Sequence, residues 1–226
     1  MNLCRFALHD SPEVARSGIF HENRVYETDG EKAIGIHDLS KLALLPPIVT
    51  SPSVRLFGKT AHDSAGYHYV NPSAMQGPLG QLGLPAGFAG LNIRWAAVVG
   101  EAAEALDAGE AAPHILAYTL LVNVFTEPFG DDFPFACGPF LFTPDVLDFS
   151  KPIAAEVKVG DQVLNLQMPL PTLHEELSVA SQTRFILPGD LIAGRPLPFE
   201  WGATPAAGQQ LSARLGDLTP LVVHLT

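Results

Sequence analysis

Glycine and proline residues interrupt this chain at short intervals, with 20 of each among its 226 residues. Glycine favours turns and proline cannot continue a helix or a central strand, so the chain is divided into short segments. Hydrophobic residues still make up 47% of the sequence and charged residues only 16%. Such a chain can bury a sizeable core, which argues against disorder as its main state. The sequence therefore predicts a β-rich globular protein with many turns.

Most segments between these breaks have the patterns of β-strands. Residues 115–125 form a long apolar run, which is typical of a strand buried on both faces. Residues 91–99 form a second such run, which ends at Gly100. Further strands are predicted over residues 3–8, 18–27 with a turn at residues 22–23, 53–58, 67–70, 139–143, 153–159 and 221–225.

Two segments have helical patterns. Residues 101–113 are rich in Ala and Glu and precede Pro113, which ends the predicted helix. Residues 172–186 predict a second helix, with Thr172 as its N-cap and Glu175 completing a capping box.

A pair of prolines divides the chain near its N-terminus. Pro46 and Pro47 stop any helix or strand and mark a linker. We therefore expect a small N-terminal lobe over residues 1–47 and a main domain over residues 48–226, a division that the length of the chain permits.

Charge and cysteine content restrict the partners and the compartment. The formal net charge is −11 at pH 7, so nucleic acids and anionic membranes are expected not to be partners. Cys4 and Cys137 form neither a disulfide framework nor a zinc motif, and each is expected to be a small apolar residue in a reducing compartment. The N-terminus has no signal-peptide pattern, and no apolar stretch is long enough to span a membrane. These features predict a cytoplasmic protein.

Four segments, in this order and spacing, resemble motifs of the fumarylacetoacetate hydrolase superfamily over roughly residues 50–226. The first two are similar to a Lys-Pro-Pro-Ser-Ala-x-x-Gly-Pro loop, and to a Glu-x-Glu-Leu-Ala-Val-Val-Ile-Gly strand followed by an acidic helix and a Tyr-Thr strand. The last two are similar to Leu-Gly-Pro-Trp-x-x-Thr and to Pro-Gly-Asp-x-Ile-x-Thr-Gly-Thr-Pro. In this chain the segments are Asn71-Pro72-Ser73-Ala74 with Gly77-Pro78, Ala96-Ala97-Val98-Val99-Gly100 with Tyr118-Thr119, Cys137-Gly138-Pro139-Phe140-Leu141-Phe142-Thr143, and Leu187-Pro188-Gly189-Asp190-Leu191-Ile192 with Gly194 and Pro196.

The resemblance implies a mixed α/β, β-dominated protein: a fumarylacetoacetate-hydrolase-like fold whose rolled sheets surround a central pocket. It also implies a hydrolase, lyase or isomerase that acts on a small oxo acid. Members of the superfamily are commonly homodimers and hold a divalent cation with three or four carboxylates. Hard cations such as Mg²⁺ prefer oxygen ligands, and they stabilise the negative charge of an enolate formed from the substrate.

The carboxylates that the resemblance implies are missing from this chain. Asn92 and Arg94 match the Glu-x-Glu pair, and Asn123 matches an Asp on the strand after Tyr-Thr. An arginine offers only donors and a fixed positive charge, so it would repel a divalent cation at close range. We therefore expect no metal site of the family type and no cofactor.

The three substituted positions allow a functional and a structural interpretation. Arg94 would hold a substrate carboxylate or an enolate in place of the metal, or it is a structural arginine paired with an acid such as Glu127 or Asp132. Asn92 and Asn123 would orient the substrate, or they are buried amides that satisfy backbone groups.

Four further residues complete the candidate site. Glu127 and His62 are candidates to move a proton, although His62 is alternatively a surface histidine. Asn71 matches the loop lysine of the family and is a candidate substrate-binding residue. Arg195 follows the Pro-Gly-Asp turn and would close over a carboxylate, or it is a solvated loop residue.

Two functions from different classes follow. The first is a metal-independent enzyme that acts on a small oxo acid or β-dicarbonyl compound by C–C hydrolysis, decarboxylation or tautomerisation, through an enolate held by Arg94. The second is a catalytically inactive homologue that binds a ligand or supports an active partner subunit. In either case we expect a homodimer or a pairing with a paralogue.

Overall fold

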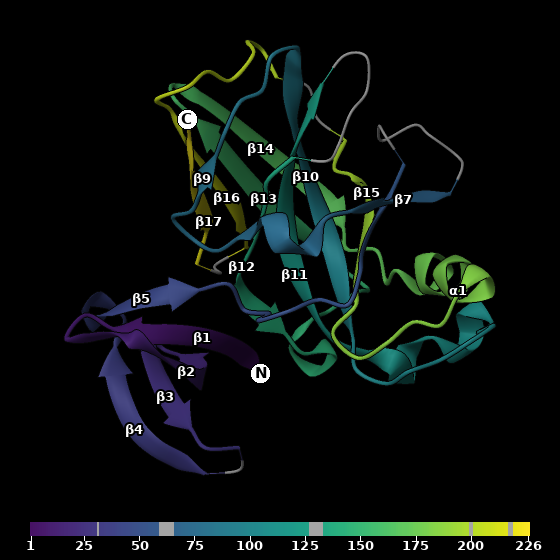
Figure 1. Ribbon diagram of the computed structural model, residues 1–226, viewed down its shortest axis with the longest axis horizontal. Coiled ribbons are helices and arrows are strands. Elements are labelled where there is room, and N and C mark those ends of the chain that lie inside the picture. The colour runs from purple at the N-terminus through teal and green to yellow at the C-terminus, as the bar shows by residue number, and fades with distance from the viewer. Residues whose placement is uncertain (31, 59–65, 127–132, 199–200, 217–218) are drawn as a thin grey trace.

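The computed structural model describes residues 1–30, 32–58, 66–126, 133–198, 201–216 and 219–226 (Figure 1). The strands are β1 (Asn2–Leu8), β2 (Ser11–His21), β3 (Arg24–Thr28), β4 (Ala33–Asp38), β5 (Leu42–Leu45), β6 (Val54–Phe57), β7 (Tyr67–Val70), β8 (Met75–Gln76), β9 (Gln81–Leu82), β10 (Phe88–Val99), β11 (Ile115–Thr126), β12 (Phe135–Phe142), β13 (Pro152–Val159), β14 (Gln162–Pro169), β15 (Leu191–Pro196), β16 (Gln210–Leu215) and β17 (Leu221–Leu225). The helices are α1 (His174–Thr183) and the short 3₁₀ turns η1 (Leu39–Lys41), η2 (Pro72–Ala74), η3 (Ala108–Glu110), η4 (Ala112–His114) and η5 (Pro144–Val146).

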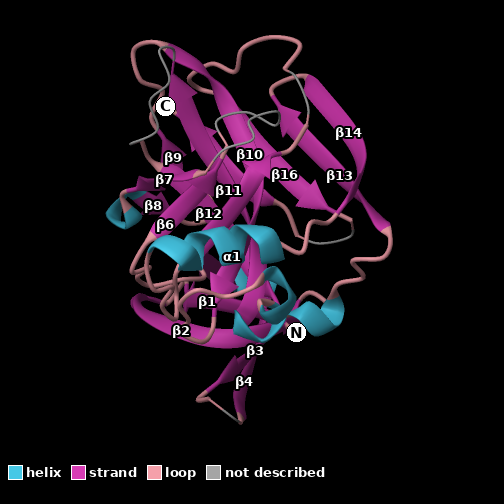
Figure 2. Ribbon diagram, turned by 90° about the vertical axis from the view of Figure 1, so that its right-hand side faces the viewer, coloured by secondary structure: helices cyan, strands magenta, loops and turns pink. Residues whose placement is uncertain are grey.

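Two sheets contain the strands of the described residues. The larger sheet has the order β4-β3-β2-β1-β12-β11-β10-β15-β6-β7, with β5 paired to β1 and β8 paired to β12. The smaller sheet has the order β14-β13-β16-β17-β9. Strands dominate the architecture, as Figure 2 shows, and this confirms the predicted β-dominated fold class.

The two long apolar runs of the sequence form the centre of the larger sheet. Strands β10 and β11 pair antiparallel along their length, and nearly all of their residues are buried. Successive side chains of a strand alternate between its faces. Ile93 and Trp95 accordingly belong to one apolar cluster, and Ala96 and Val98 belong to another on the opposite face. Burial on both faces explains why these strands are apolar throughout.

The strands of the expected N-terminal lobe extend away from the rest of the molecule in both ribbon views (Figures 1 and 2). They still belong to the larger sheet, because β1 pairs with β12 at Asn2–Phe142 and Leu3–Leu141. The rings of Phe20 and Phe140 also stack, with centroids 4.6 Å apart. A division of the chain at residue 47 stays a prediction.

The helix predicted over residues 101–113 does not form. The structure has only η3 and η4 there, and Ala105 has a left-handed backbone with φ of 51°. The N–H groups of Ala103 and Ala105 donate to the carbonyls of Ile186 and Ser181 rather than along a helix. Tertiary hydrogen bonds override the helix propensity of this Ala- and Glu-rich segment.

The second helix forms as α1 but begins later than predicted. Its N-cap is Leu173, which has φ of 60° and makes no side-chain capping bond. Thr172 lies one residue earlier, and its carbonyl accepts a hydrogen bond of 2.7 Å from the Tyr118 hydroxyl. The capping role predicted for Thr172 is therefore wrong.

Both cysteines are buried and free. Burial raises the pKa of each thiol, Cys4 and Cys137, to about 12. Both thiols are therefore protonated at neutral pH and behave as small apolar side chains.

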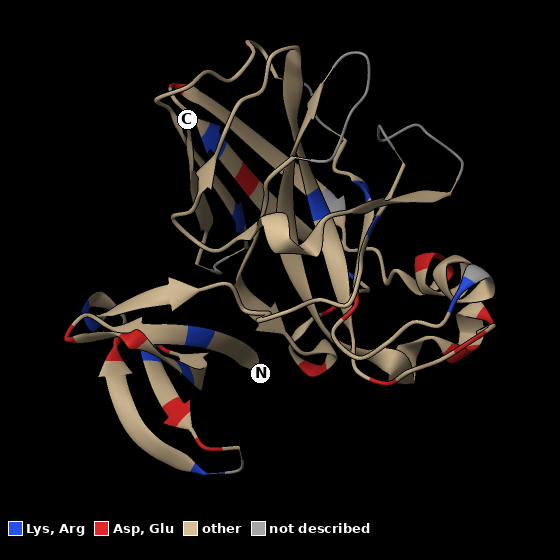
Figure 3. Ribbon diagram, in the orientation of Figure 1, with Lys and Arg blue, Asp and Glu red and all other residues tan. Residues whose placement is uncertain are grey.

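Acidic residues gather on α1 and on the segment beside it (Figure 3). Exposed carboxylates there include Glu104, Asp107 and Glu110, and Glu175 in the first turn of α1.

Among the described residues, no helix has both the length and the apolar content needed to cross a membrane.

Glu27 gives the N-terminal strands a pH-dependent contact. Its carboxylate lies 2.9 Å from Arg16 Nη1 and 2.7 Å from His37 Nε2. Burial alone would raise the pKa of Glu27, but the hydrogen bonds from His37 and Arg16 outweigh it and lower that pKa. The stability from this carboxylate is therefore fully present above its unfolded pKa of about 4.3, and it is lost as pH falls through the lower folded pKa.

Replacing Glu27 with glutamine is expected to lower the free energy of unfolding at pH 7 by about 1–2 kcal/mol, because hydrogen bonds to a charged group contribute about 1.5–3 kcal/mol and glutamine keeps one acceptor oxygen. The difference from wild type should shrink as the pH is lowered below about 4. Urea unfolding at pH 7 and pH 3.5 measures both. Glu13→Gln, at an exposed position on β2, is the matched control, and an equal loss in both variants would contradict the prediction.

Candidate functional site

Strands β10 and β11 bring the three substituted positions together on one face. Asn92 and Asn123 lie directly opposite each other in the antiparallel register. Arg94 lies two residues after Asn92 and so projects from the same face of β10. The spacing in the sequence predicts this placement, because side chains along a strand alternate between its faces.

Arg94 is fully buried, and its guanidinium donates hydrogen bonds to four described acceptors. Nε donates to Asn123 Oδ1 at 2.9 Å. Nη1 donates to the carbonyls of Phe57 at 2.6 Å and Gly194 at 2.9 Å, and Nη2 donates to the carbonyl of Gly58 at 3.0 Å. One side chain of β10 thus binds β11, β15 and the end of β6. These bonds fix the position and orientation of a positive charge in the protein interior.

This arrangement does not fit a divalent cation. The guanidinium carries a permanent positive charge, because arginine is not deprotonated in proteins. The oxygen of Asn123 and three backbone oxygens already accept from it. Within the part of the chain that the structure describes, no group of three or more His, Cys, Asp or Glu residues is arranged to hold a metal ion. The residues at the positions that the resemblance assigns to metal ligands are therefore unsuited to that role.

Asn92 connects this polar face to a cavity of about 370 Å³. Beyond its pairing with β15, β10 also accepts hydrogen bonds from Leu197 and Trp201. The N–H of Leu197 donates to the carbonyl of Ile93 at 2.8 Å, and Trp201 Nε1 donates to the carbonyl of Leu91 at 3.1 Å. The described residues that line the cavity are Ala89, Leu91, Asn92, Phe125, Leu197, Trp201 and Thr204.

No described contact joins the other predicted site residues to Asn92, Arg94 or Asn123. Asn71 is exposed, and its Oδ1 accepts from the N–H of Ser73 at 3.0 Å, which caps η2. Arg195 is exposed on β15, directly after Gly194. His62 and Glu127, together with Asp132, lie outside the described residues. The roles of all these residues stay predictions.

A second buried arginine escapes prediction from the sequence. Arg55 on β6 is 2% exposed, and its guanidinium donates to the carbonyls of Ala180 and Phe185 at 2.8 and 3.0 Å. It also pairs with Asp190 at 3.4 Å. The signal for this role is an arginine inside the short apolar strand Val54–Phe57.

The residues around Arg55 stabilise β6, the strand whose end accepts a hydrogen bond from Arg94. Its guanidinium lies 5.5 Å from the ring centroids of both Tyr67 and Tyr69 on β7. Asp190 in turn accepts from Ser53 Oγ at 2.9 Å and from the N–H of Leu187 at 2.9 Å. The aspartate of the Pro-Gly-Asp segment is thus part of a buried structural network, and β6 is held by an arginine at each end.

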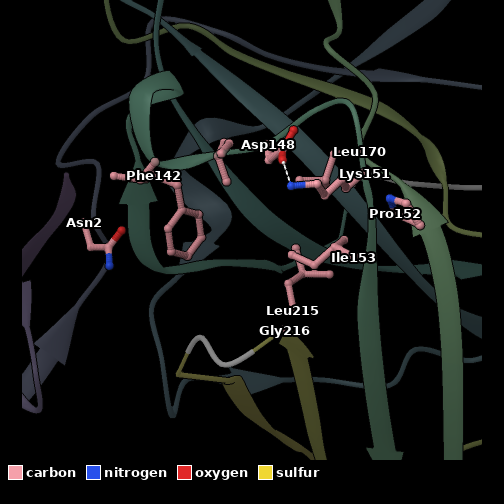
Figure 4. Close-up of a pocket in the computed structure, with 11 residues that line it drawn as sticks. Asn2, Phe142, Asp148, Lys151, Pro152, Ile153, Leu170, Leu215 and Gly216 are labelled. Carbon is pink, nitrogen blue, oxygen red and sulfur yellow. Dashed lines mark ion pairs between the residues drawn. The ribbon is translucent and has the colours of Figure 1, made fainter.

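A separate cavity of about 310 Å³ lies between the start of β1, the end of β12 and the smaller sheet (Figure 4). Leu170, Ile153 and Leu215 line it, and the ion pair between Lys151 and Asp148, 2.8 Å apart, lies at its wall. None of the described candidate residues lines this cavity. We therefore place the candidate site at Asn92, Arg94 and Asn123.

Comparisons with known proteins identify the fold. No protein-family model and no curated protein sequence matches the chain. Among solved structures, it is similar to 2-hydroxyhepta-2,4-diene-1,7-dioate isomerase from Mycobacterium marinum, with a TM-score of 0.81, 21% identity and coverage of 100% of this chain and 98% of the other. It is also similar to maleylpyruvate hydrolase from Sphingobium sp. SYK-6 in complex with manganese(II) and pyruvate (TM-score 0.78, 16% identity, coverage 100% and 99%). A third similar structure is fumarylacetoacetate hydrolase from psychrophilic Exiguobacterium antarcticum (TM-score 0.75, 17% identity, coverage 100% and 99%).

The described architecture defines the chain as a β-dominated protein whose two sheets share a core, with a polar cluster on the central strands. Its fold is that of fumarylacetoacetate hydrolase, over the full length of the chain. The resemblance seen in the motifs is thereby confirmed at the level of the fold.

Proposed function

We propose that this protein is a metal-independent enzyme that acts on a small oxo acid or β-dicarbonyl compound at Asn92, Arg94 and Asn123. The observation that carries the proposal is the buried guanidinium of Arg94, at a position where the resemblance implies a metal ligand. The reaction would be C–C hydrolysis, decarboxylation or tautomerisation, each of which passes through an enolate. Isomerase and hydrolase names among the similar structures support an enzyme of this general kind.

The charge of Arg94 would act by electrostatic stabilisation. Its four described acceptors are neutral amide and carbonyl oxygens. A fixed positive charge in a site of low dielectric favours negative charge that develops nearby, and it needs no reorganisation when the reaction occurs. Asn92, at the wall of the cavity, would orient the ligand through its amide. Glu127 and His62 remain the candidates to move a proton.

A second function is favoured by the same hydrogen bonds. A guanidinium that already links β6, β10, β11 and β15 has a structural purpose without any ligand. On this alternative the protein is an inactive homologue that binds a ligand or supports an active partner subunit. A cytoplasmic location, and a homodimer or a pairing with a paralogue, are part of either proposal.

Oxalate, a mimic of a pyruvate enolate, is expected to bind the protein in EDTA, and added Mg²⁺ should not change the affinity. Asn92→Leu should weaken binding by about 1.5–3 kcal/mol, the range for a hydrogen bond to a charged group. Isothermal titration calorimetry measures this, with Asn165→Leu at an exposed position on β14 as the matched control. Binding that requires Mg²⁺ would refute metal independence.

Catalysis is tested separately from binding. Enolate formation exchanges the C3 protons of pyruvate for deuterium in D₂O, and proton NMR follows that exchange in EDTA. Exchange faster than in buffer alone supports the enzyme. Oxalate binding without exchange of pyruvate or of a longer oxo acid supports the inactive homologue.

A further inference from the structure

The described residues that line the cavity beside Asn92 carry no charge. Five of the described lining residues are apolar: Ala89, Leu91, Phe125, Leu197 and Trp201. The other two, Asn92 and Thr204, are polar but carry no charge. Among the residues that the structure describes, the cavity therefore presents hydrophobic surface together with two neutral hydrogen-bonding groups.

The aromatic walls of the cavity are fixed by the backbone of β10. Trp201 Nε1 donates to the carbonyl of Leu91 at 3.1 Å, which holds the indole against the strand edge. On the other side, a Cβ atom at Gly90 would lie 2.8 Å from Cε1 of Phe125. A glycine is therefore required for the Phe125 ring to lie as close to β10 as it does. The position of this cavity wall thus depends on Gly90.

We propose that this cavity receives the side arm of the substrate, and that the arm is uncharged and bulky, such as an aryl group. The inference rests on the proposed function, in which the oxo acid head binds at Asn92 and Arg94. An arm that carries a second carboxylate would lose its hydration in the cavity without gaining a cationic partner among the described lining residues, which is costly. An aryl arm instead buries apolar area against Trp201, Phe125 and Leu197.

The size of the cavity agrees with an aryl arm. A dry cavity of about 150 Å³ is large enough to bind benzene. The cavity beside Asn92 is about 370 Å³, which accommodates a phenyl ring and the carbons that join it to an oxo acid. The similar structure from Mycobacterium marinum is named for a 1,7-dioate, a compound with a carboxylate at each end. The preference that we infer for this chain differs from that chemistry.

Three 2-oxo acids that differ only at C4 test the inference: 2-oxobutanoate, 2-oxoglutarate and 2-oxo-4-phenylbutanoate. Calorimetric titration in EDTA is expected to show the phenyl compound binding at least about tenfold more tightly than the other two, as apolar contact in a pocket allows. Trp201→Ala should weaken binding of the phenyl compound by about tenfold relative to binding of oxalate.

A charge introduced at the exposed residue Thr204 gives the converse test. Thr204→Arg places a cation at the cavity and should move the preference toward 2-oxoglutarate, whereas Thr204→Gln, a neutral control, should leave the order unchanged. If oxalate binds but the phenyl compound binds no better than 2-oxoglutarate, the inference is overturned and the proposed function stands. If neither oxalate nor any of the oxo acids binds, the proposed function fails and the inference fails with it.

Discussion

Replacing Arg94 with methionine is expected to lower the free energy of unfolding by about 3–5 kcal/mol. Methionine has a similar length and refills much of the apolar space, but it donates no hydrogen bond. The carbonyls of Phe57, Gly58 and Gly194 and the amide oxygen of Asn123 would each lose a donor that the structure gives them. A buried acceptor left without a partner costs about 1–3 kcal/mol, and partial relaxation limits the sum.

Urea unfolding followed by circular dichroism measures this loss. Arg195→Met is the matched control, because Arg195 is exposed on β15, one residue after a carbonyl that Arg94 binds. An exposed substitution of this kind is expected to change stability by less than about 0.5 kcal/mol. A change below about 1 kcal/mol in Arg94→Met would show that the guanidinium does not hold these strands together.

A lysine at position 94 separates charge from geometry. Arg94→Lys keeps a positive charge but replaces a planar group of five N–H donors with a single ammonium. It cannot reach acceptors on three other segments at once, so stability should fall to a value between wild type and Arg94→Met. If the charge alone supports oxalate binding, this variant should bind oxalate more tightly than Arg94→Met.

The central strands and the placement of the site could be predicted because both depend on local patterns. The apolar run at residues 115–125 forms β11, and residues 91–99 lie within β10. The i, i+2 spacing of Asn92 and Arg94 places both side chains on one face, since strand periodicity is 2. The matching position of Asn123 followed from the resemblance, and the register of β10 with β11 sets it opposite Asn92.

The partners of Arg94 could not be predicted, because three of its four described acceptors are backbone carbonyls. Every residue has a carbonyl, so no residue type signals that Phe57, Gly58 or Gly194 will accept from a side chain far away in sequence. The failed helix at residues 101–113 has the same origin. Its N–H groups bond to Ser181 and Ile186, and no pattern within the segment reports those partners.

Introducing carboxylates at Asn92, Arg94 and Asn123 is expected to create a site for a divalent cation. The triple variant Asn92→Glu, Arg94→Glu, Asn123→Asp places three acids where the register now brings two amides and a guanidinium together. Three buried carboxylates repel one another, so the variant should be much less stable than wild type in EDTA. Mn²⁺ offers the positive charge that they lack, and carboxylate oxygens suit it.

Thermal unfolding with and without Mn²⁺ checks this result. A cation present at about 100 times its Kd stabilises the folded state by about 2.7 kcal/mol, which corresponds to a rise in Tm of about 5–10 °C for a chain of this size. Wild type should show no such rise, and neither should the neutral control Asn92→Gln, Arg94→Gln. If the triple variant folds but gains no stability from Mn²⁺, the backbone at these positions does not present side chains to a common point, and the prediction is wrong. A clear rise would mean that the backbone at these three positions can present carboxylates to a common point, as a metal site requires.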